Sequence, residues 1–150
     1  MQWIAFLVTL VPFIELRGGI LLAVAAGYDP ALAFVVCVLL NILIIPLAFA
    51  ILDVIVPPLR RRSKTARRLY GWAVSRVKKH EGLSMAGLAI FVGVPLPGTG
   101  AYAGALLADL IGMERKKAAL AIAIGVVIAG ALLWLLAVVG LFFVKGLTPP

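Results

Sequence analysis

The chain has 150 residues, of which 64% are hydrophobic, and its formal net charge is +8. A soluble domain of this size leaves most of its residues near the surface, so it cannot hide this much apolar surface from water. The composition therefore predicts an integral membrane protein. Nine of the fourteen Lys and Arg residues lie between Arg60 and Lys79. A cationic segment between apolar stretches indicates a cytoplasmic loop that contacts anionic lipid headgroups, and not a nucleic-acid surface.

Residue types that bind metals or catalyse reactions are scarce in this chain. Cys37 is the one cysteine and His80 the one histidine, which excludes a disulfide framework and a multi-cysteine metal site. The sequence has no pattern of a catalytic triad, HExxH, CxxC or P-loop. We therefore expect no enzyme activity, no cofactor and no metal site.

Four apolar regions follow one another, at residues 2–27, 31–56, 83–111 and 118–144. About 20 apolar residues cross a bilayer core, so each region is long enough to span. The second and fourth regions are nearly uninterrupted and predict full membrane spans. The first and third regions are broken near the middle by prolines, glycines or charges.

The two interruptions predict re-entrant hairpins. The first, residues 12–19, contains Glu15 and Arg17, and the second is residues 95–100. Proline breaks the helical hydrogen-bond ladder, and ionised side chains at mid-membrane depth are costly. Irregular backbone inside a membrane is tolerated only where protein or a polar cavity satisfies it. Each interrupted region is therefore expected to form two half-helices that meet at a tip near the bilayer centre.

A shift of 85 residues aligns the two halves without a gap. Pro12 falls on Pro97, Gly27 falls on Gly112, and six of the sixteen positions from 12 to 27 are identical. Shared membrane composition is the alternative explanation. We predict an all-α integral membrane protein with two inverted repeats, each a re-entrant helical hairpin plus one transmembrane helix, joined by a basic amphipathic helix. The single membrane domain, 1–150, then consists of repeat one at 1–56, a basic cytoplasmic linker at 57–82 and repeat two at 83–150.

Charge placement predicts the topology. If all four apolar regions crossed the membrane, the basic segment 60–79 and the turn 114–117 would face opposite sides, which conflicts with the positive-inside rule. Re-entrant hairpins place both on the cytoplasmic side, and they place the turn 28–30 and both termini outside. The repeats are then inverted, and their tips approach each other near the midplane, as in many transporters. We expect a multi-pass protein of the plasma membrane.

Residues 59–79 have the pattern of an amphipathic helix that lies in the membrane interface. Apolar side chains recur at helical spacing with Arg and Lys between them, and Tyr70 and Trp72 suit the headgroup level. We expect the segment from Arg60 to Lys79 to tether the two repeats to anionic headgroups. The alternative is that its basic side recruits an anionic substrate.

Glu15 and Arg17 are the sharpest candidates for a site, because a charge within the membrane usually marks function. The planar guanidinium of Arg17 suits the oxygens of an anionic group. A carboxyl group shielded from water, such as that of Glu15, can bind and release a proton. Gly18 and Gly19 complete this tip. The alternative is a structural ion pair that caps the free ends of the half-helices.

The second tip offers a seat for an anion. Glycines expose backbone N–H groups, and a helix that begins near Ala101 aims its positive end at the tip. Two hydroxyl side chains lie close by. The alternative is a tight turn that lets two helices pack closely. The predicted substrate and coupling residues of this tip are Pro97, Gly98, Thr99, Gly100 and Tyr102.

Three further polar residues are weaker candidates. Asn41 is expected to form a hydrogen bond between helices. Asp53 precedes two prolines and is expected to pair with Arg60 or Arg61. Asp109 lies two turns beyond the second tip, close to the predicted cytoplasmic exit.

The two tips also resemble a known family. Residues 12–19, Pro-Phe-Ile-Glu-Leu-Arg-Gly-Gly, and residues 94–106, Val-Pro-Leu-Pro-Gly-Thr-Gly-Ala-Tyr-Ala-Gly-Ala-Leu, resemble the two signature stretches of the putative small multidrug export protein family. That family is similar to the DedA, or VTT, superfamily of membrane proteins. The resemblance covers nearly the whole chain and implies two re-entrant hairpins with inverted symmetry. It also implies transport or lipid flipping, because DedA-like relatives are associated with proton-coupled translocation of undecaprenyl phosphate and other lipids.

By this resemblance Glu15 and Arg17 match the charged first tip. The second tip departs from the DedA pattern, because Pro-Gly-Thr-Gly stands where that superfamily has an arginine-rich motif. Residues and resemblance together predict a small membrane transporter or lipid flippase of DedA-like type, which moves a small or lipid-linked anionic substrate between the tips, coupled to protons. The alternatives are a small multidrug exporter of amphipathic cations and a non-transporting structural membrane protein. Two full spans are few for a sealed path, so we expect a homodimer.

Overall fold

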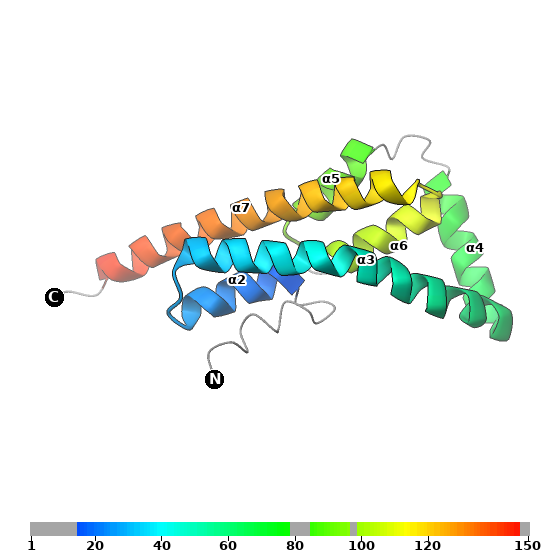
Figure 1. The fold of residues 1–150 in the computed structure, drawn as a ribbon, viewed down its shortest axis with the longest axis horizontal. Helices are drawn as coiled ribbons and strands as arrows, with labels where there is room; N and C mark the ends of the chain where they lie inside the picture. The colour runs from blue at the N-terminus through cyan, green and yellow to red at the C-terminus, as the bar shows by residue number, and fades with distance from the viewer. Residues whose placement is uncertain (1–14, 79–84, 97–98, 148–150) are drawn as a thin grey trace.

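The computed structural model describes residues 15–78, 85–96 and 99–147, and within these segments every regular element is a helix. Figure 1 shows two long helices, α3 and α7, side by side and running in opposite directions, with α4 across the end at which α3 finishes and α7 begins. The all-helical architecture predicted from the sequence is confirmed. In chain order the helices are α2 (Glu15–Ala25), α3 (Pro30–Arg62), α4 (Lys64–Lys78), α5 (Met85–Gly93), α6 (Ala101–Ile111) and α7 (Arg115–Leu147).

Helices α3 and α7 each contain a stretch that is long and apolar enough to cross a membrane, Pro30–Leu59 and Arg115–Phe143. The first stretch has 30 residues, and at 1.5 Å per residue it reaches about 45 Å, more than a hydrocarbon core of ~30 Å. Large apolar side chains along both helices face outward; Leu43, Val54 and Phe142 are 69%, 72% and 75% exposed. Such a surface is unfavourable in water and suits lipid. The fold is therefore that of a helical membrane protein, as the composition predicts.

Helices α2 and α6 end in the same kind of turn. Gly27 and Gly112 follow them with φ angles of +89° and +70°, in the left-handed region that glycine adopts without strain. The N–H of Tyr28 donates to a carbonyl in the last turn of α2 at 3.0 Å, and the N–H of Met113 makes the same bond to α6 at 3.0 Å. Each turn reverses the chain, so α2 packs along α3 and α6 packs along α7.

The two long helices also correspond to each other. Both have 33 residues, and their first residues, Pro30 and Arg115, are 85 positions apart. Asp29 caps α3, because its carboxylate accepts hydrogen bonds from two N–H groups of the first turn at 2.9 and 3.1 Å. Proline fits the first helical position, where its missing N–H would have no partner. The offset found in the sequence thus recurs in the helix boundaries.

Small residues let the shorter helices approach α7 closely. A Cβ atom on Gly125 of α7 would lie 2.6 Å from Cβ of Val92 in α5, and one on Gly104 of α6 would lie 2.7 Å from Cγ2 of Val92. A larger residue at either position would have to push these helices apart. Membrane helices usually associate through small residues, since lipid tails leave little hydrophobic drive for contact between helices. Helices α5, α6 and α7 therefore meet tightly around Val92.

The helix of the basic segment starts later than the sequence predicts. Helix α3 continues through Pro57 and Pro58, Ser63 has an extended conformation (φ −118°, ψ 118°), and α4 begins only at Lys64. The prolines remove two helical N–H donors. Both are exposed at the charged end of the molecule, where water can satisfy the carbonyls that they leave open. The predicted interfacial helix 59–79 is therefore divided at Ser63.

Candidate functional site

The first turns of α2 and α6 face each other in the middle of the molecule (Figure 1). Glu15 and Arg17 lie in the first turn of α2. Glu15 has a φ of +44°, a left-handed conformation that costs a residue with a side chain about 1–3 kcal/mol. This conformation persists because the contacts of the carboxylate and of the neighbouring Arg17 hold it in place.

The guanidinium group of Arg17 caps the end of α5. Its Nη2 donates to the carbonyls of Val92 at 3.3 Å and Val94 at 3.0 Å, and to Oγ1 of Thr99 at 2.6 Å. The carbonyls in the last turn of a helix have no partner within that helix and carry a partial negative charge. A cation here satisfies acceptors that the break between α5 and α6 would leave open. Thr99 adds to this, because its hydroxyl lies 2.8 Å from the carbonyl of Val94 and 3.0 Å from that of Leu96.

The carboxylate of Glu15 caps the start of α6. Its Oε1 accepts a hydrogen bond from the N–H of Tyr102 at 3.3 Å. Its Oε2 lies against Gly100, where an added Cβ atom would overlap the carboxylate. The first N–H groups of a helix have no partner within the helix and carry a partial positive charge. An anion is therefore stabilised at this position, and the absence of a side chain at Gly100 gives it room.

Glu15 and Arg17 also pair with each other. Nη1 of Arg17 lies 3.5 Å from Oε2 of Glu15, and the two side chains are 11% and 5% exposed. Buried charges are tolerated when their remaining hydrogen-bonding groups find partners. Each charge here contacts both the opposite charge and the backbone groups at the end of a helix. Nε of Arg17 is buried and has no hydrogen-bond partner within the described part of the chain, so it can serve a further acceptor.

The structure brings five of the nine residues predicted at the two tips into one cluster, which we call the tip cluster. It joins the two halves of the chain across more than 80 positions. Pro97 and Gly98 lie outside the described residues. Tyr102 contributes its backbone N–H to Glu15, although the sequence singled it out for its hydroxyl. The tip cluster consists of Glu15, Arg17, Thr99, Gly100 and Tyr102.

The sequence suggests that Gly18 and Gly19 belong to the turn at the tip. In the structure they lie inside α2 and do not form a turn. Gly19 is buried and Gly18 is half-buried. Glycine is a poorer helix former than alanine by about 1 kcal/mol. Inside a membrane protein this cost is offset, because a small residue allows close approach of a neighbouring helix. The helix therefore begins at the first charged residue of the tip and not after the glycines.

Among the described residues, Asn41 makes its hydrogen bond within its own helix, where the sequence suggests a bond to another helix. Nδ2 of Asn41 donates to the carbonyl of Cys37 at 3.2 Å, one turn earlier in α3. Its Oδ1 is buried without a partner in the segments that the structure describes. A short polar side chain reaches the carbonyl four residues back more readily than a neighbouring helix.

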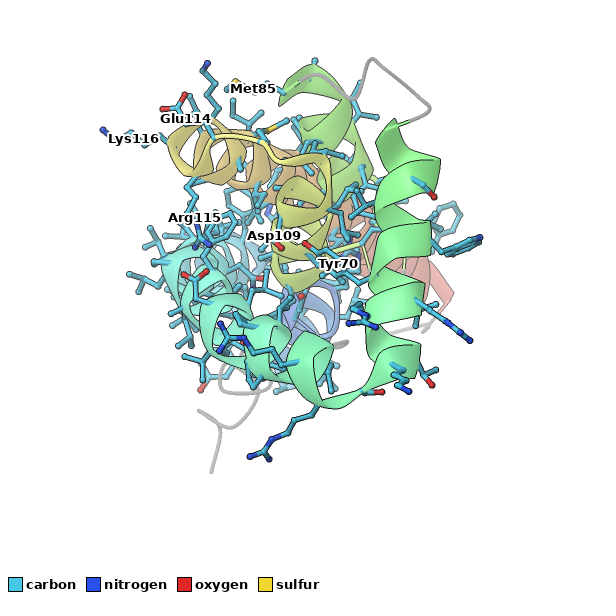
Figure 2. All side chains as sticks on the ribbon, turned by 90° about the vertical axis from the view of Figure 1, so that its right-hand side faces the viewer. Tyr70, Met85, Asp109, Glu114, Arg115 and Lys116 are labelled. Atoms are coloured by element: carbon cyan, nitrogen blue, oxygen red, sulfur yellow. The ribbon has the colours of Figure 1, made fainter. Side chains whose placement is uncertain are left out.

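Asp53 and Asp109 each connect two helices away from the tip cluster. Asp53 of α3 pairs with Arg115 of α7. The sequence suggests Arg60 or Arg61 as its partner instead. Packing of α7 along α3 determines this choice, since the start of α7 lies beside that part of α3. Asp109 of α6 accepts a hydrogen bond from the hydroxyl of Tyr70 in α4 at 2.9 Å (Figure 2).

Sequence reasoning missed the acceptors of Arg17. Val92 and Val94 take part through their carbonyls, and their apolar side chains give no sign of this role. The one available signal is their position, because both precede the proline-rich break at which α5 must end. A helix end in a membrane needs partners for its carbonyls.

A comparison with protein families identifies the chain. The family described as "Putative small multi-drug export protein" matches residues 15–132. The chain belongs to this family. The match begins at Glu15 and includes both sides of the tip cluster, in agreement with the family predicted from the two tips. The description is that of an export protein, a kind of membrane transporter. No match was found among curated proteins or among solved structures.

Proposed function

We propose that this chain is a small membrane transporter of DedA-like type, in which an anionic substrate passes between two re-entrant hairpin tips. The observation that carries the proposal is the tip cluster. Arg17 and Glu15 of α2 hold the facing ends of α5 and α6 by hydrogen bonds, with little exposure of either side chain. Buried charges at a break between helices are typical of substrate and ion sites in membrane transporters.

Three features support an inverted repeat. The pairs α2–α3 and α6–α7 share their turn geometry at an offset of 85 residues, and α3 and α7 run in opposite directions (Figure 1). Helices α5 and α6 have 9 and 11 residues, about 14 and 17 Å at 1.5 Å per residue, which is too short to cross the bilayer core alone. In the proposal α5 and α6 form the second hairpin, and α2 is the return arm of the first. The repeats are residues 1–56 and 83–150, with the linker at 57–82.

Charge supports an orientation in the plasma membrane. The end of α3, all of α4 and the start of α7 lie at one end of the molecule (Figure 1), and these segments carry most of the cations. By the positive-inside rule this end is cytoplasmic, and both termini are outside. Exposed Arg67 and Arg68 of α4 then lie against anionic headgroups. A second copy of the chain completes the barrier around the short helices, so the proposed assembly is a homodimer.

In the proposed cycle, a proton and an anion share the Glu15–Arg17 pair. When Glu15 takes up a proton, it loses the negative charge that attracts Arg17. Arg17 then binds an anionic group of the substrate through its planar fork and its unpartnered Nε. Loss of the proton restores the pair, and the carboxylate displaces the anion. Free and lipid-linked anions both present the oxygens that this step requires.

The family description favours a second candidate, an exporter of amphipathic cations. In that case the carboxylate of Glu15 binds the cation, and Arg17 stays on the carbonyls of the tip. Organic cations are commonly bound against aromatic faces, and Tyr102 is the aromatic residue whose N–H lies at Glu15. The two candidates therefore differ in which charge of the pair contacts the substrate.

Flux in proteoliposomes that contain a pH-sensitive dye tests the proposal. Octyl phosphate serves as the anionic probe and ethidium as the cationic probe. A gradient of octyl phosphate should drive proton movement through the wild-type protein. Arg17→Lys keeps the charge but loses the planar fork, so the flux should fall by about tenfold, and Glu15→Gln should abolish proton movement.

The matched control is Lys117→Gln, an exposed charge outside the tip cluster, which should leave the flux unchanged. A response to ethidium alone would select the cation exporter. Full flux in a folded Glu15→Gln/Arg17→Gln double variant would show that the pair is structural and that the proposed path is wrong.

A further inference from the structure

A groove between α3 and α7 lies at the basic end of the molecule, and none of the tip cluster lines it. Its volume is about 380 Å³, within the usual range of small-molecule sites of about 300–1,000 Å³. Part of its lining is apolar and part is charged. The apolar lining residues are Ile45, Pro46, Phe49, Ala50 and Ala119, and the charged ones are Asp53, Arg115 and Lys116.

The charged end of the groove carries a net positive charge. Figure 2 shows Arg115 reaching from the start of α7 toward α3, where it pairs with Asp53. Its guanidinium carbon lies 5.0 Å from the centre of the Phe49 ring. Lys116 is exposed and has no ion-pair partner among the described residues. The next residue, Lys117, does not line the groove and pairs instead with Glu114 at 3.3 Å.

The apolar part of the groove is shaped for a chain. Ile45 and Phe49 form its buried floor, at 3% and 7% exposed, while Pro46 and Ala50 are exposed beside them. Alanines at positions 50 and 119 occupy little space, which leaves the groove open along the two helices. Both helices contain candidate membrane spans, so the open side faces lipid in the bilayer.

We propose that this groove binds one anionic phospholipid. The phosphate lies between Lys116 and Arg115, and one acyl chain runs over Phe49 toward Pro46. The positive charge of the lining selects an anionic lipid, because a negative headgroup fits the charged part of the groove and an acyl chain fits the apolar part. A soluble anion would leave the apolar part unused, and a zwitterionic headgroup would bring its own cationic group next to Lys116 and Arg115. The site is separate from the tip cluster and does not depend on transport.

Native mass spectrometry of the full chain in detergent tests this site. The probes are phosphatidylglycerol and phosphatidylcholine with the same oleoyl chains, and the affinity of the first bound lipid is measured. Phosphatidylglycerol should bind more tightly than phosphatidylcholine. Lys116→Gln should weaken its binding about fivefold, as expected for one lysine at an anionic headgroup. Lys117→Gln makes the same change in net charge one residue away and should leave the affinity unchanged.

A second pair of variants tests the apolar part without changing the charge. Ala50→Phe fills the groove and should remove the preferred lipid, whereas Ala131→Phe, at an exposed position of α7 outside the groove, should not. Soluble glycerol phosphate should fail to compete. Equal losses for Lys116→Gln and Lys117→Gln, equal affinity for both lipids, or full competition by glycerol phosphate would each overturn the proposal. Loss of a dimer with unchanged lipid binding in Ala50→Phe would show that a second copy covers the groove.

Discussion

Glu15 and Arg17 each lie where the end of a helix offers the opposite partial charge. Arg17 contacts carbonyls at the end of α5, and Glu15 contacts an N–H at the start of α6. The break in the second half of the chain therefore receives its missing partners from the first half. This arrangement explains why two costly charges are kept in an apolar chain, since each satisfies backbone groups that lipid cannot satisfy.

A double-mutant cycle on this pair follows from its burial. Glu15→Gln and Arg17→Gln should each lower the free energy of unfolding in detergent by about 3–5 kcal/mol, because each leaves the other charge buried and unpaired. The double variant should lose less than the sum of the two, since no lone charge remains. Chemical unfolding of the four proteins provides the measurement. Strictly additive losses would show that the two side chains do not interact.

A substitution at Gly100 tests how closely the carboxylate of Glu15 fits against the start of α6. In Gly100→Ala the new Cβ atom would overlap the carboxylate of Glu15, so the side chain must move off the helix end. We expect a loss of about 1–3 kcal/mol in the free energy of unfolding and a lower flux in proteoliposomes. Gly140→Ala is the matched control, because nothing lies within 4 Å of its added Cβ atom. Equal behaviour of the two variants would contradict the described contact.

At the residue scale, the sequence predicts which side chains matter better than what they touch. The charges at Glu15 and Arg17 are conspicuous in an apolar run, and the broken tip near Thr99 and Gly100 is conspicuous for its glycines. The inverted-repeat prediction also expects the two tips to approach each other, and hydrogen bonds from Arg17 to Thr99 and from Tyr102 to Glu15 join them in the structure. The side chains of Val92 and Val94 do not indicate that their carbonyls bind Arg17, and only their position before the proline-rich break points to this role.

At the element scale, the uninterrupted apolar runs predict α3 and α7, and the glycine tip predicts the start of α6 at Ala101. The same residue type misleads in α2, where Gly18 and Gly19 are helical. A glycine pair in a membrane sequence is compatible with a turn and with close packing, and only the neighbouring helix decides. The pairing of Asp53 with Arg115 likewise depends on how α3 and α7 are aligned.

The contact between α4 and α6 gives a prediction for the basic helix. Tyr70→Phe removes the hydroxyl that donates to Asp109, so the free energy of unfolding in detergent should fall by about 1 kcal/mol. Asp109→Asn should lower it as well, and the two changes together should cost less than their sum. If the two losses simply add, the hydrogen bond does not connect α4 to α6.

At the scale of the whole molecule, the placement of the charges and the 85-residue offset between α3 and α7 both agree with the proposed architecture. Helices α3 and α7 are of equal length, run in opposite directions and begin 85 residues apart. The start of α7 and the whole of α4 lie at the same end of the molecule (Figure 1). If α5 and α6 enter and leave the membrane on one side, both basic connections are cytoplasmic, and the charge rule is obeyed throughout.

Labelling with a membrane-impermeant maleimide in intact cells tests this architecture most directly. In a Cys37→Ala background, single cysteines replace exposed residues in three variants: Lys64→Cys at the start of α4, Lys117→Cys at the start of α7 and Ala26→Cys in the turn after α2. Positions 64 and 117 should react only after the membrane is permeabilised, and position 26 should react in intact cells. Reaction of positions 64 and 117 from opposite sides of the membrane would contradict the re-entrant, inverted-repeat architecture.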